Sequence, residues 1–553
     1  MRKPILALLL LAAAHLPVSA GVQYMVIGYG QSLSTGNWGC GLISVSQPYS
    51  NQMLSNNGTG TTLVPLTEQA SQWQTNSCTG FVYAYSSGTS YLPGQVVMSG
   101  ANAYKAITTV PAGNAPPNST YWAQVSAFLE SPVSSTANNL TYLAQQENST
   151  SFTVISNGYG HGGYNIAELE RGTAPYNALL TGVTNAKAAA VAAGNTLVVL
   201  GVVFTEGEAD WSANSTTYYN DCLTLHANLL SDISAITSQN ATAYPIPFFY
   251  SQTSQAMAES QAGNTPGPYF ACPDGTDLCL DDSTGSNIAS NGEGVVIAQW
   301  RLAHDFPNLF YLTGPKYQYT YYQGQDYHLD YAGYNYLGAT TARILKCLYV
   351  DHAPNCVAGV YPKSIVMSAK QITVTVGTPT NAAYPNGIPL DTPGNSILPY
   401  PWRGNGSGSI DSNGMGFQVF QTVSGMQSAI PISSVTTSGQ TITITLSQLP
   451  NAAATNLRLV YAFEGVHYGS GLVQGCSPDA TACGMDTLIT PEHGQLHGNI
   501  YTVPDYTSLA PSVTGGSGSS GVPVRHFMVH FNEQILPLGS ATISGGACSG
   551  CRL

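Results

Sequence analysis

The chain alternates short apolar runs with helical stretches over its first 350 residues. The runs are rich in β-branched and aromatic residues and lie at 22–28, 152–155, 196–204, 246–250 and 308–312. Stretches with helical spacing or many alanines lie at 176–193, 218–237, 292–304 and 331–349. This alternation predicts an α/β layer around a parallel sheet. In such sheets the functional groups gather beyond the carboxyl ends of the strands.

Two regions depart from this alternation. Residues 81–129 carry spaced tyrosines and glycines with the apolar pair Val96-Val97, and they predict a small β-module inserted into the α/β domain of residues 21–80 and 130–356. After residue 357, threonine or serine alternates with isoleucine or valine at 371–376 and 441–446, which is typical of half-buried strands. These patterns predict a β-sandwich over 357–510. The Gly/Ser-rich run 515–521 predicts a linker within a C-terminal segment 511–553, in which 527–531 is a further strand.

The first twenty residues have the pattern of an export signal. Arg2 and Lys3 precede an apolar stretch at 5–14, and small residues end at Ala20. The pattern predicts cleavage after Ala20 and a secreted, periplasmic or cell-surface protein. No later segment has the length of apolar sequence that a transmembrane helix needs, so no transmembrane segment is expected.

The cysteines agree with an oxidising compartment. There are 11, and short loops suggest the pairs Cys272/Cys279, Cys347/Cys356, Cys476/Cys483 and Cys548/Cys551, with a longer loop between Cys40 and Cys78. This would leave Cys222 single. Zinc at Cys548 and Cys551 is the alternative, although no histidine or second cysteine pair lies nearby in the sequence.

Composition excludes several classes of protein. Charged residues make up only 8% of the chain, against about 25% in ordinary soluble domains, so coiled coils and long charged helices are excluded. The net charge is −13 with no basic run after the N-terminus, which argues against a nucleic-acid partner. Hydrophobic residues at 43% are sufficient for several cores.

Two glycine-rich turns follow the first two predicted strands. The first is Gly28-Tyr29-Gly30-Gln31-Ser32, which could expose the Ser32 hydroxyl above the sheet edge. A serine needs a base and an oxyanion pocket before it can act as a nucleophile. The second turn contains Gly162-Gly163, whose backbone N–H groups could face an anion. Each turn could equally be an ordinary connection.

Carboxylates and an imidazole follow the later strands. Glu206, Glu208 and Asp210 come directly after the third run and could be an acid/base pair, a cation site or a solvated turn. Asp326 and His328 precede the last helix. A carboxylate that holds one imidazole nitrogen leaves the other free to accept a serine proton. The alternative is a surface ion pair.

The four blocks together resemble the SGNH (GDSL-type) hydrolases, and within them the sialate O-acetylesterase-like carbohydrate esterases. The resemblance covers about 21–45 and 150–350. It implies a flavodoxin-like parallel sheet flanked by helices, with Ser32 as nucleophile, His328 as base and Asp326 as its orienting carboxylate. The implied oxyanion hole consists of Ser32, Gly162, Gly163 and Glu206.

Two positions differ from the family pattern. Leu33 stands where asparagine commonly follows the serine, and Glu206 stands where glutamine is usual. Because an ionised carboxylate cannot donate to an oxyanion, Glu206 is either protonated by burial or absent from the hole. Glu208 and Asp210 match the pattern and are expected to brace loops.

The inserted region resembles the carbohydrate-binding modules of families five and twelve. Aromatic faces stack on sugar rings, so the resemblance implies Tyr85, Tyr121 and Trp122 as candidate substrate-binding residues, with Trp122 alternatively a core residue. An acidic loop with Asp274, Asp277, Asp281 and Asp282 is interpreted as solvated, with a calcium site as the alternative.

The sequence therefore predicts an exported esterase that removes O-acetyl groups from carbohydrate without metal or organic cofactor. The first alternative is a non-catalytic glycan-binding or surface-structure protein built on an esterase-like core. A glycosidase that uses Glu208 and Asp210 is the second alternative.

Overall fold

The computed structural model describes most of the chain between residues 21 and 537. The described segments are 21–40, 49–67, 84–91, 96–125, 129–210, 213–253, 269–271, 278–281, 287–288, 293–319, 328–353, 356–357, 359–378, 384, 386–390, 414–424, 426–462, 498, 500–502, 506–507, 523–526 and 528–537. The predicted signal segment lies outside them. Across these residues, no helix has both the length and the apolar character that a bilayer crossing requires.

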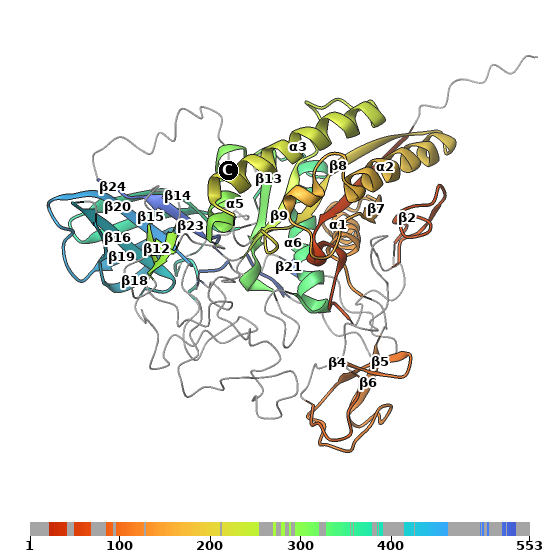
Figure 1. The fold of residues 1–553 in the computed structure, drawn as a ribbon, viewed down its shortest axis with the longest axis horizontal. Helices are drawn as coiled ribbons and strands as arrows, with labels where there is room; N and C mark the ends of the chain where they lie inside the picture. The colour runs from red at the N-terminus through yellow and green to blue at the C-terminus, as the bar shows by residue number, and fades with distance from the viewer. Residues whose placement is uncertain are drawn as a thin grey trace, which may run out of the picture.

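A seven-stranded sheet forms the centre of the N-terminal part (Figure 1). In spatial order its strands are β13 (Phe310–Pro315), β9 (Phe248–Gln252), β8 (Asn195–Thr205), β1 (Gly21–Gly30), β7 (Val154–Gly158), β2 (Gln52–Leu54) and β3 (Leu63–Pro65). The first six strands are parallel to one another, and β3 is an antiparallel edge. The parallel α/β architecture predicted from the sequence is confirmed.

The order of the five long strands determines where a site can form. Numbered along the chain, they lie in the order 2-1-3-4-5, which is that of flavodoxin-like sheets. The direction of winding reverses between β1 and β8, so the loops that leave these two strands diverge. A crevice at the carboxyl end of such a switch point is where open α/β sheets bind ligands. Ser32 follows β1 there, and Glu206 follows β8.

Five α-helices among the described residues cover the sheet. They are α1 (Pro132–Asn148), α2 (Ala174–Ala192), α3 (Ser215–Thr237), α5 (Glu293–Asp305) and α6 (Tyr331–Tyr349). Side chains of α1 and α6 share one buried cluster with one face of the sheet. Those of α2, α3 and α5 share another cluster with the opposite face. The strands are therefore buried on both sides, as parallel sheets require.

Helix α1 was not predicted, although Val133, Ala137, Leu140 and Leu143 are buried at helical spacing. Serine, asparagine and threonine residues between them are buried as well, and they obscure this apolar period in the sequence. Its start is nonetheless specified: the Ser131 hydroxyl accepts from the N–H of Ser134 at 3.4 Å, and a proline occupies the first turn.

A three-stranded antiparallel sheet lies within the predicted inserted region, and in Figure 1 it stands apart from the central sheet. It consists of β4 (Val96–Ser99), β5 (Asn102–Ala106) and β6 (Trp122–Val125). One set of its side chains packs with Leu129, at the end of the inserted region, and with Cys40 and Tyr331 of the main domain. Lys105 donates to the Tyr331 hydroxyl at 3.1 Å, and its ammonium lies 5.6 Å from the centroid of that ring.

Two further sheets form the C-terminal part, at one end of the molecule in Figure 1. The first contains β18 (Ile432–Ser438), β19 (Thr441–Leu446), β15 (Gln371–Gly377), β14 (Tyr361–Ser368) and β24 (Leu536–Pro537). The second contains β17 (Met426–Ala429), β16 (Phe417–Val423), β20 (Ala454–Tyr461) and β23 (Phe531–Gln534). Both contribute to one buried cluster. Strands β23 and β24 lie beyond residue 510, so each sheet includes a strand from the segment predicted as linker and tail.

Small elements complete the described structure. They are the strands β10 (Tyr269–Ala271), β11 (Leu278–Asp281), β12 (Asn287–Ile288), β21 (Tyr506–Thr507) and β22 (Pro523–Val524), and the short helices η1 (Ser32–Thr35), η2 (Ile166–Leu169) and η3 (Lys316–Gln318).

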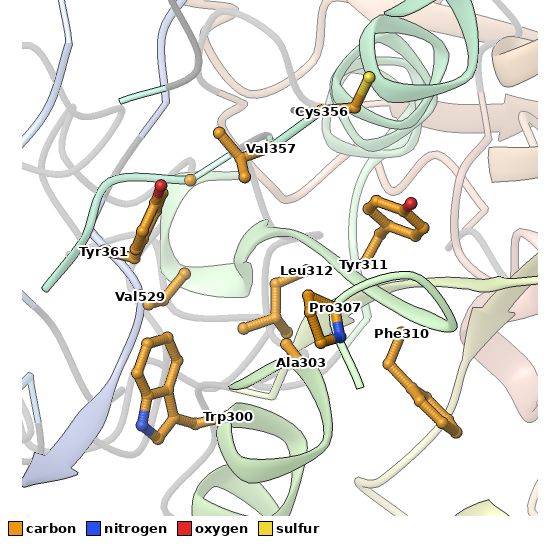
Figure 2. A pocket seen from close by; sticks show the side chains of 11 residues that line it. Trp300, Ala303, Pro307, Phe310, Tyr311, Leu312, Cys356, Val357, Tyr361 and Val529 are labelled. Atoms are coloured by element: carbon orange, nitrogen blue, oxygen red, sulfur yellow. The ribbon is translucent and has the colours of Figure 1, made fainter. Parts of the chain in front are cut away.

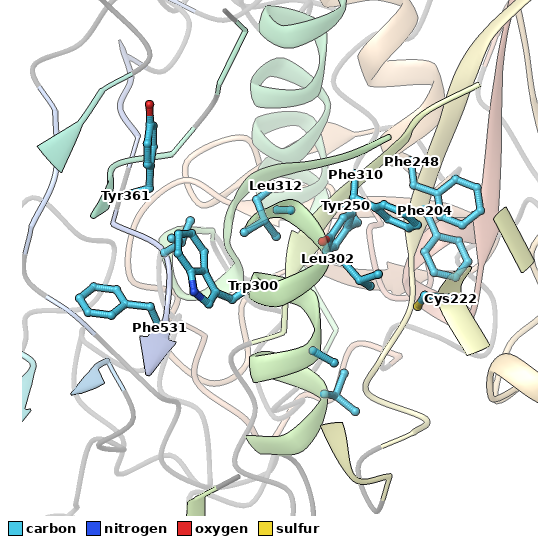
Figure 3. Packing of buried hydrophobic residues seen from close by; sticks show 14 of the residues in the cluster. Phe204, Cys222, Phe248, Tyr250, Trp300, Leu302, Phe310, Leu312, Tyr361 and Phe531 are labelled. Atoms are coloured by element: carbon cyan, nitrogen blue, oxygen red, sulfur yellow. The ribbon is translucent and has the colours of Figure 1, made fainter. Parts of the chain in front are cut away.

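The core is continuous between the central sheet and the C-terminal sheets. Figure 3 shows Trp300 of α5 beside Phe531 of β23, and the ring centroids lie 6.3 Å apart. The Trp300 indole N–H also donates to the Glu533 carboxylate at 2.7 Å. Nearby, Gln252 of β9 exchanges two hydrogen bonds with the backbone of His530. These contacts join the two parts through apolar packing and satisfied polar groups.

One predicted disulfide is present among the described residues: Cys347 and Cys356 are joined, with Cα atoms 5.7 Å apart. Cys40 is disulfide-bonded, and Cys78, its expected partner, lies outside the described residues. Cys222 is free and buried, as predicted. The other predicted pairs, and the acidic loop from Asp274 to Asp282, fall on residues whose side chains the structure does not describe.

Candidate active site

The turn after β1 requires glycine at its last strand position. Gly30 has φ +128°, and a Cβ there would lie 2.1 Å from the carbonyl oxygen of Thr205 on β8. The backbone N–H of Gln31 donates to the same carbonyl at 3.0 Å. β1 and β8 therefore approach closely where the chain turns toward Ser32, and a side chain at position 30 would separate them.

Ser32 begins a single 3₁₀ turn, η1, that presents its hydroxyl. Gln31 and Leu33 are buried on either side, whereas Ser32 is partly exposed. The Ser32 carbonyl accepts from Thr35 Oγ1 at 2.8 Å and from the N–H of Asn37 at 3.2 Å, which fixes the turn. Leu33, which differs from the family pattern, packs into the core shared by α1 and α6. The position after the serine is thus a core position in this chain.

His328 reaches Ser32 from the other end of the α/β part. Its Nε2 lies 2.9 Å from Ser32 Oγ. The residue lies two positions before Asp330, the N-cap of α6, whose carboxylate accepts from the N–H of Gly333 at 2.7 Å. The next residue, Leu329, is fully buried. A capped helix and a buried neighbour therefore hold the imidazole against the hydroxyl.

The environment of His328 favours the neutral imidazole. The side chain is buried, and burial lowers its pKa to about 3, with a further contribution from the positive charge of Lys316. A neutral ring nitrogen within hydrogen-bond distance can accept the serine proton, whereas an imidazolium cannot. Asp326, the expected partner of the other ring nitrogen, lies outside the described residues.

The glycine loop after β7 lies against the Ser32 turn. The backbone N–H of His161 donates to the Gly30 carbonyl at 2.9 Å, which continues the pairing of β7 with β1. At Gly160 a Cβ would lie 1.9 Å from Ser34 Oγ, so only glycine permits this approach. Gly162 and Gly163 follow directly. Among the described residues, the backbone N–H groups of Ser32, Gly162 and Gly163 donate to no protein acceptor.

Glu206, the fourth residue of the expected oxyanion hole, lies beside α3. It is 1% exposed, and its carboxyl accepts from the hydroxyl of Tyr218 on α3 at 2.6 Å. Burial raises the pKa of Glu206 well above its usual value, and the nearby negative charge of Asp210 raises it further. This shift favours the protonated carboxyl, and the hydrogen bond of that carboxyl is to Tyr218 of α3. The membership of Glu206 in the oxyanion hole stays a prediction.

Glu208 belongs to a buried network that no sequence pattern indicated. One of its oxygens forms an ion pair with Lys316, and both side chains are almost fully buried. The other accepts from the Gln31 side-chain amide at 2.7 Å, and the amide oxygen of Gln31 accepts from the N–H of Ala209 at 2.8 Å. The network joins the carboxyl ends of β1, β8 and β13 directly beside Ser32.

Lys316 could have been found from the sequence. It is one of only 15 basic residues in the chain and follows the fifth predicted strand by a few positions. The rule that singled out Ser32 and Glu206 applies equally to this strand end.

Asp210 braces the glycine loop, as expected. Its carboxylate accepts from the N–H of Ile166 at 2.7 Å, at the start of η2. Asn165 and Glu168 complete a reciprocal capping box at the same point. The end of β8 and the end of the glycine loop are therefore tied together.

In the inserted region, Trp122 is a core residue. It is 3% exposed, its indole N–H donates to the Asn114 carbonyl at 2.8 Å, and its ring meets that of Tyr91 edge-on at 5.3 Å. The burial of Trp122 against Tyr85 and Tyr91 favours the core alternative over a substrate-binding role. Tyr85 and Tyr121 pack against the same cluster and are partly exposed.

A separate apolar pocket lies between α5, β13 and the C-terminal part (Figure 2). Its lining includes neither Ser32 nor His328 and carries no carboxylate, histidine or serine; the residues are Trp300, Ala303, Pro307, Phe310, Tyr311, Leu312, Cys356, Val357, Gly359, Tyr361 and Val529. The described residues contain no cluster of three or more histidine, cysteine or carboxylate side chains suited to a metal ion.

Comparison with known proteins gives faint likenesses. No family model and no curated protein matches the sequence. Similar solved structures include a carbohydrate acetylesterase from Xanthomonas citri (TM-score 0.38, 10% identity, covering 87% of this chain and 78% of that chain). Others are a protein from Arabidopsis thaliana (TM-score 0.31, 14% identity, 58% and 97%) and NanS (TM-score 0.27, 13% identity, 44% and 71%). Likenesses at this level carry no argument about the activity of this chain.

Proposed function

We propose that the protein is an exported serine esterase that removes O-acetyl groups from a carbohydrate. The observation that carries the proposal is the 2.9 Å contact between Ser32 Oγ and His328 Nε2 at the switch point of the parallel sheet. The two residues are 296 positions apart in sequence, and each is held by the backbone of its own strand end or helix start. The resemblance of the four sequence blocks to carbohydrate esterases supplies the substrate class.

The reaction follows from the positions of these groups. Ser32 Oγ attacks the ester carbonyl carbon while its proton passes to His328 Nε2. The N–H groups of Ser32 and of Gly162 or Gly163 are the proposed donors to the oxyanion. As the intermediate collapses, the imidazolium returns the proton to the sugar oxygen, which leaves as an alcohol. Water deprotonated by His328 then attacks the acetyl-serine and releases acetate. Asp326 is the proposed orienting carboxylate of His328.

The neutral state of His328 supports this assignment. A base that must accept a proton in the first step is useful only when it is unprotonated at rest. Burial and the positive charge of Lys316 both lower its pKa, so the imidazole is neutral at neutral pH. Glu208 and Asp210, by contrast, are held by Lys316 and by the backbone of Ile166, which argues against a glycosidase that uses these two carboxyls.

The test is a serine-to-alanine exchange measured by acetate release. Ser32→Ala is expected to lower acetate release from an acetylated sugar by at least about 10³-fold, with an unchanged unfolding transition. Ser55→Ala is the matched control, because the Ser55 hydroxyl pairs with that of Thr62 in the exposed turn between β2 and β3. Undiminished acetate release in Ser32→Ala would contradict the assignment.

A further inference from the structure

The segment between Ser32 and Cys40 holds an indole beside the proposed catalytic pair. Trp38 lies six positions after Ser32, and its ring centroid is 6.2 Å from that of His328, with the planes tilted by 40°. Trp38 is partly exposed, whereas Asn37, Gly39 and Cys40 around it are buried. No motif in the sequence singled it out.

The backbone of Trp38 is held in an unfavourable conformation. Its φ is +68°, in the left-handed region that bulky residues rarely adopt. Such strain persists only where the surroundings fix the chain, and it concentrates at functional sites. A glycine would occupy this position without strain. The presence of a tryptophan there therefore points to a role for the indole side chain.

Buried contacts on both sides of Trp38 fix the strained loop. The Tyr334 hydroxyl on α6 donates to the Asn37 carbonyl at 2.7 Å, and the N–H of Glu130 donates to the Gly39 carbonyl at 2.8 Å. At Gly39 a Cβ would lie 2.6 Å from the Tyr334 ring. The loop is therefore anchored to the same helix, α6, that positions His328. Indole and imidazole cannot drift apart without breaking these contacts.

The inserted sheet adjoins the end of the same loop. Cys40 packs with Val96 and Met98 of β4, and Tyr331 of α6 belongs to the same cluster. The region that resembles a carbohydrate-binding module thus contacts the segment carrying Trp38, on the side away from Ser32 in sequence.

We infer that Trp38 is a sugar-stacking platform that selects ring-shaped carbohydrate esters for the Ser32–His328 pair. This inference rests on the proposed esterase function. A partly exposed aromatic face binds the apolar face of a pyranose ring, and the indole gives the largest such face. A ring seated there would carry an exocyclic acetyl ester next to Ser32. Trp38 is thus a specificity-determining residue, and it takes no part in proton transfer.

The test compares two acetyl esters that differ in the ring. A peracetylated methyl glycoside has a pyranose ring, whereas triacetin carries acetyl esters on a flexible chain. Trp38→Ala is expected to lower kcat/KM for the glycoside about tenfold, mainly through KM, and to change kcat/KM for triacetin less than about threefold. Trp38→Phe, which keeps an aromatic face, is expected to recover part of the loss. Trp300→Phe, in the buried junction with the C-terminal sheets, is the matched tryptophan control.

The other outcomes are decisive against the inference. An equal fall for both esters in Trp38→Ala would show that the indole acts through the loop and not on the sugar. No change for either ester would show that it does not contact substrate. Failure of the proposed function is distinguished by the parent protein, which would then hydrolyse neither ester. In that case, binding of the glycoside to the Ser32→Ala protein, with and without Trp38→Ala, still tests the platform: equal affinities overturn it.

Discussion

Two buried pairs lie at the same edge of the central sheet and differ in charge and in surroundings. Ser32 and His328 form a neutral pair whose serine is partly exposed. Lys316 and Glu208 form an ion pair, in which the second carboxylate oxygen accepts from Gln31 and both side chains are almost fully buried. In the first pair, the serine residue is partly exposed. The second leaves little open to solvent.

This difference in charge and burial indicates which pair can transfer a proton and which pair stabilises the arrangement of the strands. The hydroxyl of a partly exposed serine beside a neutral imidazole can lose its proton when a carbonyl carbon approaches. A buried ion pair is strongly destabilised when one partner is removed, because the other charge stays unpaired. We therefore assign the chemistry to Ser32 and His328, and the alignment of β1, β8 and β13 to the Lys316 network. Variants of each pair test this division.

The largest effect is expected at His328. His328→Ala removes the proposed base but leaves the Ser32 turn, which is fixed by its own backbone contacts. We expect acetyl-ester hydrolysis to fall by at least about 10³-fold, with a thermal unfolding midpoint within a few degrees of the parent. Steady-state kinetics and a thermal scan measure both quantities. Activity within about tenfold of the parent would remove the distinction between the two pairs.

The next effect concerns stability at the ion pair. Lys316→Met leaves Glu208 buried without its cation, and we expect the free energy of unfolding to fall by about 3–5 kcal/mol. The double variant Glu208→Gln/Lys316→Met leaves no charge in the site and should recover a large part of this loss. Chemical denaturation provides the comparison. If the single and double variants were equally stable, the pair would not be the brace that we describe.

The pH dependence of kcat/KM distinguishes a buried, neutral His328 from a histidine with the usual pKa. Because the pKa of His328 is lowered to about 3, the base stays neutral well below the usual value of about 6.5. The fall of kcat/KM on the acid side should therefore lie near pH 3–4, at about the pKa of His328 in the folded protein. A limb near pH 6.5 would show that the imidazole is solvated.

The same shift acts on stability in a defined direction. Unfolded histidine binds a proton below about pH 6.5, whereas His328, His226 and His530 resist protonation when folded, with pKa values lowered to about 3, 4 and 3. Their contribution is complete above about pH 6.5 and is lost as the pH falls toward about 4 for His226 and about 3 for His328 and His530. Each histidine contributes a slope of roughly 1.4 kcal/mol per pH unit. Chemical denaturation at several pH values measures the summed contribution of the three histidines to the free energy of unfolding. A free energy of unfolding that did not change with pH would contradict the burial of these groups.

The smallest effect is expected at Glu206, which supports the site from the α3 side. Tyr218→Phe removes the hydroxyl that donates to the Glu206 carboxyl. We expect a loss of about 1–2 kcal/mol in stability and less than about a threefold change in the turnover rate. Tyr219→Phe is the matched control, since its hydroxyl bonds to Asp305 at an exposed position. If Tyr218→Phe instead slowed turnover by about 10³-fold, Glu206 would belong in the oxyanion hole.

Periodicity predicted the parts of the fold in which burial is apolar. The five parallel strands and helices α2, α3, α5 and α6 match the predicted runs because their buried sides are apolar. Helix α1 was not predicted because buried serine, threonine and asparagine residues are interspersed with its apolar period of Val133, Ala137, Leu140 and Leu143. The membership of strands β23 and β24 in the two C-terminal sheets was not predicted, because their partners, β20 and β14, are remote in sequence.

The residues of the candidate site that directly follow strand ends or precede a helix could be predicted from the sequence. Ser32 and His328 follow from glycine turns and from the position before the last helix, and the structure brings them together. The roles of Glu206 and Lys316 did not follow, because they depend on which face of the sheet each side chain takes. Glu206 contacts Tyr218 of α3, whereas Lys316, after β13, pairs with Glu208, after β8, across the end of the intervening strand β9. Such tertiary pairings leave no local pattern in sequence.

The central claim is that the Ser32 hydroxyl is activated by His328. Covalent labelling with a serine-directed phosphonate, followed by mass spectrometry of the digested protein, tests it most directly. We predict a single adduct on the peptide that contains Ser32, formed at least about 10³-fold more slowly in His328→Ala. An adduct on another serine, or no adduct in a protein that still hydrolyses acetyl esters, would contradict the claim.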